Sequence, residues 1–224
     1  MTPCHSQSID WLGKAEAGNL QAQYRLGKSF MVGDTIPKDI DQAITWLEKA
    51  ALKQEPRAMY LLGLCYYKGE GKIQNDTTAY QYFKSSALQG YPQAQYSLAL
   101  RYLKGEGVKK NEQRAFHWFR KASEAGVPQA RYSVGLRLQK GEGVQMNKEM
   151  ALRLYRELVL QTPHDPFFDY YLGYSYYYGT CGVKDTNAGS RYIQKAAVNG
   201  CNEAKQLLLN IRKNRNTTQQ VTYF

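Results

Sequence analysis

The chain has 224 residues, of which 43% are hydrophobic and 22% charged, a balance typical of a folded protein and not of a disordered one. A formal net charge of +11 favours acidic partners, whether proteins, nucleic acid or anionic membrane. No run of about 18 apolar residues could span a bilayer, and the polar start MTPCHSQSID lacks the apolar core of an export signal, so we expect a cytoplasmic protein, or a periplasmic or secreted one if an export signal was removed.

The chain repeats itself with a period of 36 residues. Each unit contains a tyrosine, an apolar residue two positions later, and a small residue directly after that. The tyrosines are Tyr24, Tyr60, Tyr96, Tyr132 and, after a two-residue insertion, Tyr170. Self-similarity at this period indicates a repeat architecture, with units at 19–54, 55–90, 91–126, 127–162 and 163–200.

Each unit is predicted to be a pair of helices joined by a turn. In the unit 91–126, apolar residues fall at helical spacing on both sides of a KGEG tetrapeptide at 104–107. They are Ala94, Leu98 and Tyr102 before it, and Ala115, Trp118 and Ala122 after it. The predicted fold class is all-α: a right-handed α/α superhelix, or solenoid, of about five helix-turn-helix repeats with half-repeat caps.

Glycine and capping residues mark where each helix ends and begins. Gly105 ends a first helix, because glycine adopts the left-handed conformation freely, and Lys104 lies near the negative end of that helix dipole. The second helices begin after residues whose side-chain oxygen accepts a hydrogen bond from an unpaired backbone amide. These N-caps are Asp39, Asn75, Asn111, Asn147 and Asp185.

The tetrapeptide KGEG recurs at 68–71, 104–107 and 140–143, and its glycines beside a lysine raise the alternative of a phosphate-binding loop. A phosphate loop would follow a strand and continue into GK[ST], which these copies do not. The helix–helix turn explains both glycines, and the helix end explains the lysine.

Partial units flank the repeats. WLGKAEAG at 11–18 matches only a second helix, and CNEAKQLLLNIRK at 201–213 matches only a first. We predict an N-terminal cap helix within 1–18, and within 201–224 a C-terminal cap helix followed by a loose basic tail.

The four cysteines, at 4, 65, 181 and 201, are too few and too scattered for a disulfide framework, and none forms a CxxC pair. We expect free thiols. A Cys181–Cys201 bond would join opposite ends of one helix, ~20 Å apart, whereas bridged Cα atoms lie within ~7 Å.

The repeated pattern resembles a known family. It is similar to the Sel-one-like repeat, a relative of the tetratricopeptide repeat. The shared features are, in order, alanine, tyrosine, leucine-glycine, GxGV, an Asp or Asn cap, an aromatic pair, and KAA with a terminal glycine. The best copies are EPRAMYLLGLCYYKGEGKIQNDTTAYQYFKSSALQG at 55–90 and YPQAQYSLALRYLKGEGVKKNEQRAFHWFRKASEAG at 91–126. The resemblance implies an adaptor or scaffold that holds other proteins without catalysis, including the special case of neutralising a toxin.

The resemblance also implies where a partner binds. If the first helices pack as in tetratricopeptide repeats, they line a concave groove with the residues three before, and four, seven and eight after, each marker tyrosine. The predicted partner-binding residues, which are among these positions, are Arg57, Lys68, Gln93, Lys104, Gln129, Lys140, Phe167, Tyr174, Tyr177 and Tyr178. We expect a monomer, with no cofactor and no metal.

Two interpretations of these groove residues stay open. Three lysines one solenoid step apart, with Arg57, would form a positive ladder for an acidic segment of a partner protein, or the lysines would only stabilise helix ends. The tyrosines of DYYLGYSYYYG at 169–179 would form an exposed hot spot, or they would fill a larger core.

The sequence gives little support for an enzymatic activity. The three histidines, His5, His117 and His164, include no pair at the spacing of a helical metal site, and no acid–base set stands near them. The nucleophile motif SxxK is absent from the chain.

Single-stranded nucleic-acid binding is the alternative from another class. A charge of +11 with 19 tyrosines could form a basic track with stacking platforms. Basic residues are mixed with acidic ones in most units, however, as in KDIDQAITWLEK, and only IRKNRN near the end is purely basic. The sequence therefore favours a protein partner.

Overall fold

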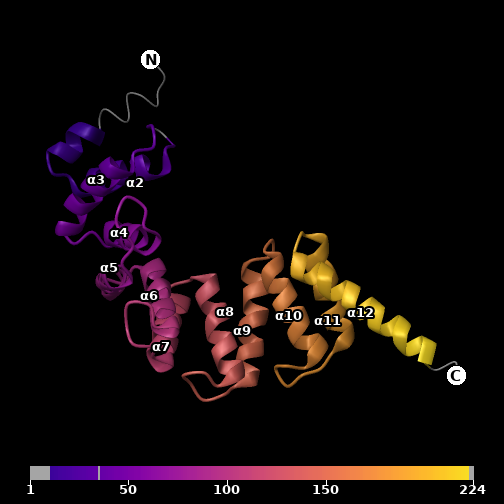
Figure 1. Ribbon diagram of the computed structural model, residues 1–224. Helices are drawn as coiled ribbons and strands as arrows, with labels where there is room; N and C mark the ends of the chain where they lie inside the picture. Colours follow the sequence, from indigo (N-terminus) through magenta and orange to yellow (C-terminus); the bar gives the residue numbers. More distant parts are fainter. Residues whose placement is uncertain (1–10, 35, 222–224) are drawn as a thin grey trace. The chain divides into compact units, whose positions relative to one another are not determined.

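The computed structural model describes residues 11–34 and 36–221, and side chains as far as residue 213. Helices joined by short turns make up this part of the chain, and no strand occurs in it (Figure 1). The predicted fold class, an all-α solenoid of about five helix-turn-helix repeats, is confirmed. Residues 1–10 of the predicted N-terminal cap lie outside the described residues.

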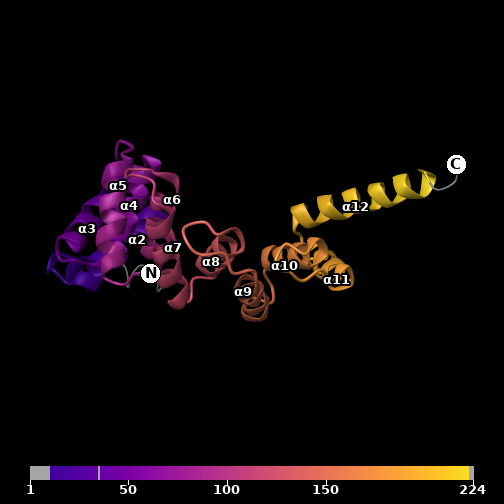
Figure 2. The same ribbon diagram turned by 90° about the horizontal axis from the view of Figure 1, so that it is seen from below.

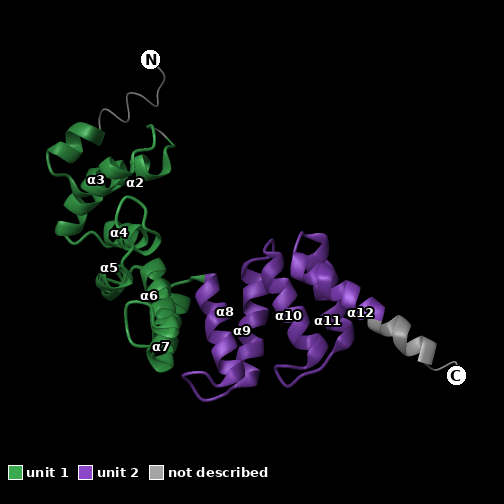
Figure 3. Cartoon of the chain, viewed as in Figure 1, with its two compact units in different colours: residues 1–127 green, residues 128–224 purple. Residues whose placement is uncertain are grey.

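The chain divides into two compact units, residues 1–127 and 128–224 (Figure 3). Residues 11–16 of the first unit are helical, and its repeats follow as the pairs α2 (Leu20–Val32) and α3 (Ile40–Leu52), α4 (Pro56–Lys68) and α5 (Asp76–Leu88), and α6 (Pro92–Lys104) and α7 (Glu112–Glu124). Each helix packs against the next one along the chain.

The second unit has the same construction. Its helices are α8 (Pro128–Lys140), α9 (Lys148–Gln161), α10 (Pro166–Tyr178), α11 (Thr186–Val198) and α12 (Asn202–Val221). Helices α10 and α11 lie side by side in both views (Figures 1 and 2). Helix α12 continues to Val221, past the point where a loose tail was predicted; the side chains from residue 214 on and residues 222–224 lie outside the described part.

The predicted N-caps are all confirmed. In each, a side-chain oxygen accepts a hydrogen bond from a backbone amide in the first turn of the following helix. The pairs are Asp39 with Gln42 at 3.0 Å, Asn75 with Thr78 at 2.9 Å, Asn111 with Arg114 at 2.8 Å, Asn147 with Met150 at 2.9 Å, and Asp185 with Ala188 at 2.8 Å. A cap contributes ~1 kcal/mol, so the second helix of each repeat begins at a fixed residue.

The KGEG turn needs its two glycines for different reasons. Gly105 ends α6 in the left-handed conformation, with φ 79°, and its amide donates to the Arg101 carbonyl oxygen at 2.8 Å. Gly107 also has a positive φ, and a Cβ atom there would lie 2.0 Å from the carbonyl oxygen of Asp76, the first residue of α5. The second glycine therefore lets this turn lie directly on the preceding repeat.

The marker tyrosines hold neighbouring helices together. The ring of Tyr60 lies 5.9 Å from Phe83 in the second helix of its own repeat and 5.3 Å from Tyr91 at the start of the next. Tyr96 contacts Phe119 in the same way, at 5.6 Å. Aromatic pairs at these distances contribute ~0.5–1.5 kcal/mol beyond their buried area, so this series is structural.

The three described cysteines, Cys65, Cys181 and Cys201, are buried and free. Cys181 and Cys201 belong to different hydrophobic clusters of the second unit. Burial raises the pKa of both thiols, which keeps them protonated and unreactive.

Candidate functional site

All ten predicted partner-binding residues lie on first helices of their repeats. Four are in the first unit, on α4 and α6: Arg57, Lys68, Gln93 and Lys104. Six are in the second unit, on α8 and α10: Gln129, Lys140, Phe167, Tyr174, Tyr177 and Tyr178. The two glutamines are exposed and lie at matching positions, one in each unit.

Arg57 is engaged within the fold. Its Nε lies 2.6 Å from the carboxylate of buried Glu55, and its guanidinium donates to the Gln21 side chain at 2.7 Å and lies 4.3 Å from the ring centre of Tyr24. The hydrogen bond to Glu55 raises the pKa of Arg57. Because these contacts join the first two repeats, Arg57 stabilises their packing as well as lining the predicted surface.

The three ladder lysines are exposed, and each has a glutamate beside it. Nζ of Lys68, Lys104 and Lys140 lies 3.6, 3.7 and 3.7 Å from a carboxylate oxygen of the glutamate in the same KGEG. Exposed pairs of this kind contribute ~0–1 kcal/mol, and each glutamate reduces the net positive charge beside its lysine.

Two buried arginines that sequence reasoning missed belong to the same turns. Arg101 Nη1 lies 2.6 Å from Glu106 Oε2, and Arg137 Nη1 lies 3.6 Å from Glu142 Oε2. The arginine side chains are 4% and 8% exposed. The signal was an arginine on the buried face of a first helix with a glutamate five residues later, twice at one repeat step.

Helix α10 carries the largest run of aromatic contacts among the described residues. Phe167, Tyr171, Tyr174 and Tyr178, which we call the α10 aromatic ridge, follow one another at the spacing of one helix face. Ring centres lie 4.6 Å apart between Phe167 and Tyr171 and also between Tyr174 and Tyr178, and Tyr170 joins the two pairs. Three of the four rings are exposed by 38% (Phe167), 37% (Tyr174) and 47% (Tyr178).

The ridge is anchored to α8 through Tyr132. That ring lies 4.5 Å from Tyr171 and 5.2 Å from Phe167. Burial, and hydrogen bonding with Tyr171, raise the pKa of Tyr132, so its hydroxyl stays neutral. Contact with Tyr132 therefore leaves the exposed ring of Phe167 little freedom to rotate away from the ridge.

Tyr177 differs from the other predicted α10 residues. It is half-buried, packs on the hydrophobic cluster of α11 and α12, and its backbone approaches Gly189 so closely that a Cβ there would lie 2.6 Å from the Tyr177 nitrogen. The run of tyrosines is therefore partly core and partly surface: Tyr177 packs in the core, whereas Tyr174 and Tyr178 are exposed.

The described residues show no metal-ligating cluster: no three His, Cys, Asp or Glu side chains converge among them. His117 is exposed, and partial burial together with Lys121 and Arg120 lowers its pKa. No helix in the described part of the chain is long and apolar enough to cross a membrane.

Known structures resemble this one over most of its length. The chain is 30% identical to c5321, a protective antigen present in uropathogenic Escherichia coli strains and displaying an SLR fold, with a TM-score of 0.79 over 87% of this chain and 41% of that one. The chain thus spans about two fifths of the length of that antigen.

Two further structures show the fold alone. A Sel1 repeat protein from Oxalobacter formigenes is 24% identical, with a TM-score of 0.79 over 90% of this chain and 86% of that one. YrrB, a TPR protein with an unusual peptide-binding site, is 18% identical, with a TM-score of 0.57 over 91% and 97%. No curated protein matches the chain.

A family model described as the Sel1 repeat matches five segments of the sequence. They are residues 20–54, 56–91, 92–127, 128–160 and 168–201. Because these segments cover well over half of its residues, the chain belongs to the Sel1 repeat family.

Proposed function

We propose that this protein is a non-catalytic adaptor or scaffold that binds a partner protein through the first helices of its repeats, with the α10 aromatic ridge as the main contact. Sel1 repeats form a protein-interaction fold. One observation supports α10 as the main contact surface. Phe167, Tyr174 and Tyr178 are exposed, and other rings of the same helix face pack against them.

Exposed rings fixed by their neighbours suit a binding hot spot. Tyrosine offers a large contact area and loses little conformational entropy on binding, because only two side-chain torsions are frozen. A hot-spot side chain typically contributes 2 kcal/mol or more, roughly, once a partner covers it. Burial and the neighbouring rings raise the pKa of Tyr178, so its hydroxyl is a neutral hydrogen-bond donor.

The remaining predicted residues have supporting roles. Gln93 and Gln129 supply hydrogen-bonding groups on α6 and α8, and the lysines that end α4, α6 and α8 favour an acidic segment on the partner. Because each lysine is partly neutralised by its glutamate, this attraction acts mainly on the rate of encounter.

The peptide-binding site named for YrrB supports a peptide or extended segment as the bound element, since the two chains share a fold. We further propose a monomer that works in the cytoplasm, where the free state of Cys65, Cys181 and Cys201 is the default for thiols.

The test begins with affinity capture and mass spectrometry, followed by binding measurements with the purified partner. The triple variant Phe167→Ala, Tyr174→Ala, Tyr178→Ala should bind at least tenfold more weakly, ~1.4 kcal/mol or more, while its circular dichroism stays helical. The matched control is Leu160→Ala with Val198→Ala, whose side chains are 79% and 86% exposed elsewhere on the second unit.

Unchanged affinity of the folded triple variant would contradict the assignment to α10. The nucleic-acid alternative predicts a different result: binding of random single-stranded oligonucleotides that falls steeply with salt. Such binding, lost in the triple variant, would replace the protein partner as the function of the ridge.

A further inference from the structure

The turn that joins α10 to α11 lacks the second glycine of the KGEG turns at 68–71, 104–107 and 140–143. Gly71 and Gly107 each follow the glycine that ends a first helix by two positions, and Cys181 stands at the matching position after Gly179. A Cβ on Gly71 would lie 2.3 Å from Ile40 at the start of α3. The turn that contains Gly71 is therefore in direct contact with the preceding repeat. Cys181 has a side chain where none would fit at Gly71 or Gly107.

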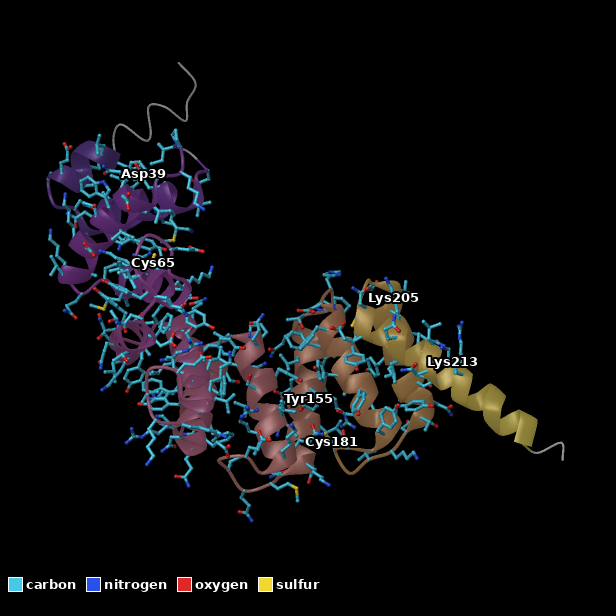
Figure 4. The ribbon with its side chains drawn as sticks, in the orientation of Figure 1. Asp39, Cys65, Tyr155, Cys181, Lys205 and Lys213 are labelled. Atoms are coloured by element: carbon cyan, nitrogen blue, oxygen red, sulfur yellow. The ribbon has the colours of Figure 1, made fainter. Side chains whose placement is uncertain are left out.

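The local geometry of this turn differs accordingly. The positive φ, at Gly71 and Gly107 in the other turns, occurs one residue later, at Gly182 with φ 87°. The amide of Gly182 donates to the Gly179 carbonyl oxygen at 3.0 Å, and a Cβ on Gly182 would meet nothing within 4 Å. The thiol of Cys181 is buried, in the cluster that contains Tyr155 (Figure 4).

A groove of about 840 Å³ lies between this turn and the first turns of α9. We call it the α9 groove; its apolar lining includes Met150, Leu152, Cys181 and Val183. Met150 and Val183 are 40% and 48% exposed, and Leu152 and Cys181 are buried. The groove therefore has an apolar floor, and it shares no residue with the α10 aromatic ridge.

The rim of the groove is predominantly positive. Lys148, Arg153 and Arg156 line it, against one carboxylate, that of Glu149. Arg156 Nε donates to the Tyr176 hydroxyl at 2.6 Å, which holds the guanidinium in place, and Arg153 Nε lies 3.0 Å from Glu157. The amino end of α9 adds the positive end of the helix dipole.

The positive charges are spread along the groove. Lys148 and Arg156 are eight positions apart on one helix, which corresponds to ~12 Å. That length matches about four residues of extended chain, at ~3.3 Å each, and exceeds the reach of one small anion.

We propose that the α9 groove is a second docking site, for an extended segment of a partner protein in which an apolar side chain is flanked by carboxylates. The apolar side chain packs between Met150 and Val183, and the carboxylates pair with Lys148, Arg153 and Arg156. This site goes beyond the binding surface proposed on α10 and stands without it. Its positive rim favours an acidic segment.

The test uses the purified full chain, labelled with ¹³C on its methionine and valine methyl groups, and three capped pentapeptides at low salt. Glu-Asp-Leu-Asp-Glu should shift the methyl resonances of Met150 and Val183. Both Gln-Asn-Leu-Asn-Gln, which lacks the charge, and Glu-Asp-Ser-Asp-Glu, which lacks the apolar side chain, should bind at least tenfold more weakly.

Two charge variants complete the design. Lys148→Glu with Arg153→Glu should weaken binding of the acidic leucine peptide at least tenfold. Arg191→Glu with Arg212→Glu makes the same change in net charge at exposed residues of the second unit outside the groove and should change binding less than twofold. The variant of α10 that removes three aromatic rings should bind this peptide as the unmodified chain does, so the two surfaces are tested separately.

Three results would overturn the proposal: equal binding of the neutral peptide, shifts that spare Met150 and Val183, or full binding by the folded Lys148→Glu, Arg153→Glu variant.

Discussion

Arg101 lies against Tyr67 of the preceding repeat, with its guanidinium carbon 4.0 Å from the ring centre, and pairs with Glu106 across the turn that ends its own helix. The guanidinium is almost fully buried, so the ring and the carboxylate replace most of its contact with water. One charged side chain thus joins the second and third repeats of the first unit.

The first prediction concerns this pair. Glu106→Gln should lower the free energy of unfolding by on the order of 2 kcal/mol, because a buried guanidinium loses its counter-charge and removing one partner costs more than the pair gains. Arg101→Met should cost less, since the apolar stem still packs on Tyr67. Urea unfolding followed by circular dichroism measures both.

Arg120→Ala is the matched control. Its ion pair with Glu124 is exposed, at 58% and 67% of the two side chains, so the change in stability should stay within ~0.5 kcal/mol. If Glu106→Gln lowers the free energy of unfolding no more than the control does, the ion pair of Arg101 with Glu106 is solvated.

Local features of the fold could be predicted from the sequence. Helix caps, turn glycines and apolar spacing act within a few residues, so Asn111 and Gly105 specify their helix ends whatever surrounds them. The repeats use similar cap and turn residues, and the family pattern matches five segments of the chain.

Contacts between repeats could not be predicted in the same way. Whether a tyrosine is surface or core depends on the helix beside it: Tyr174 is exposed, whereas Tyr177, three residues later, packs beside Gly189. The same holds for Arg57, whose guanidinium pairs with Glu55, and for Cys181, which stands beside a groove that no sequence motif predicts.

The second prediction separates backbone strain from steric contact at the turn glycines. Gly107→Ala should cost at least ~2–3 kcal/mol, because it combines a left-handed φ with a Cβ 2.0 Å from the Asp76 carbonyl oxygen. Gly90→Ala has the same sign of φ and open space around the Cβ, so only the conformational cost of ~1 kcal/mol remains. Denaturant midpoints of the two variants give the comparison; equal losses would mean that the Gly107 turn can move away from α5.

The third prediction is a pH dependence from Cys65. Burial, with a smaller contribution from Glu70, raises the pKa of this thiol to about 11. A raised pKa favours the protonated form in the folded state, so the stabilisation is complete below the pKa of the unfolded thiol and is lost as pH rises through the folded pKa. Between pH ~8.5 and ~10.5 the unmodified chain should lose on the order of 1–2 kcal/mol more than Cys65→Ala.

Unfolding curves of both proteins at the two pH values provide this measurement, and the Cys65→Ala protein removes the pH effects that the two chains share. Parallel losses in the two proteins would show that the thiol already ionises freely in the folded state.

The last prediction assigns different kinetic roles to the lysines and the rings on the first helices. Lys68→Gln, Lys104→Gln and Lys140→Gln together should slow association with the captured partner a few-fold and flatten its salt dependence, because exposed charges steer encounter. Dissociation should change less than twofold, since each lysine already pairs with a glutamate in the free protein. Arg57 stays unchanged in this variant, because its loss would disturb the packing on Tyr24.

Removal of the α10 aromatic rings should have the opposite kinetic effect, changing dissociation more than association. Phe167→Ala, Tyr174→Ala and Tyr178→Ala remove contacts that form only in the complex, so dissociation should accelerate at least tenfold while association stays within a few-fold. Surface plasmon resonance with immobilised partner resolves the two rates. If the lysine variant instead accelerated dissociation tenfold, the lysines would be making direct ion pairs with the partner in place of those with Glu70, Glu106 and Glu142, and the positive ladder would be the principal contact.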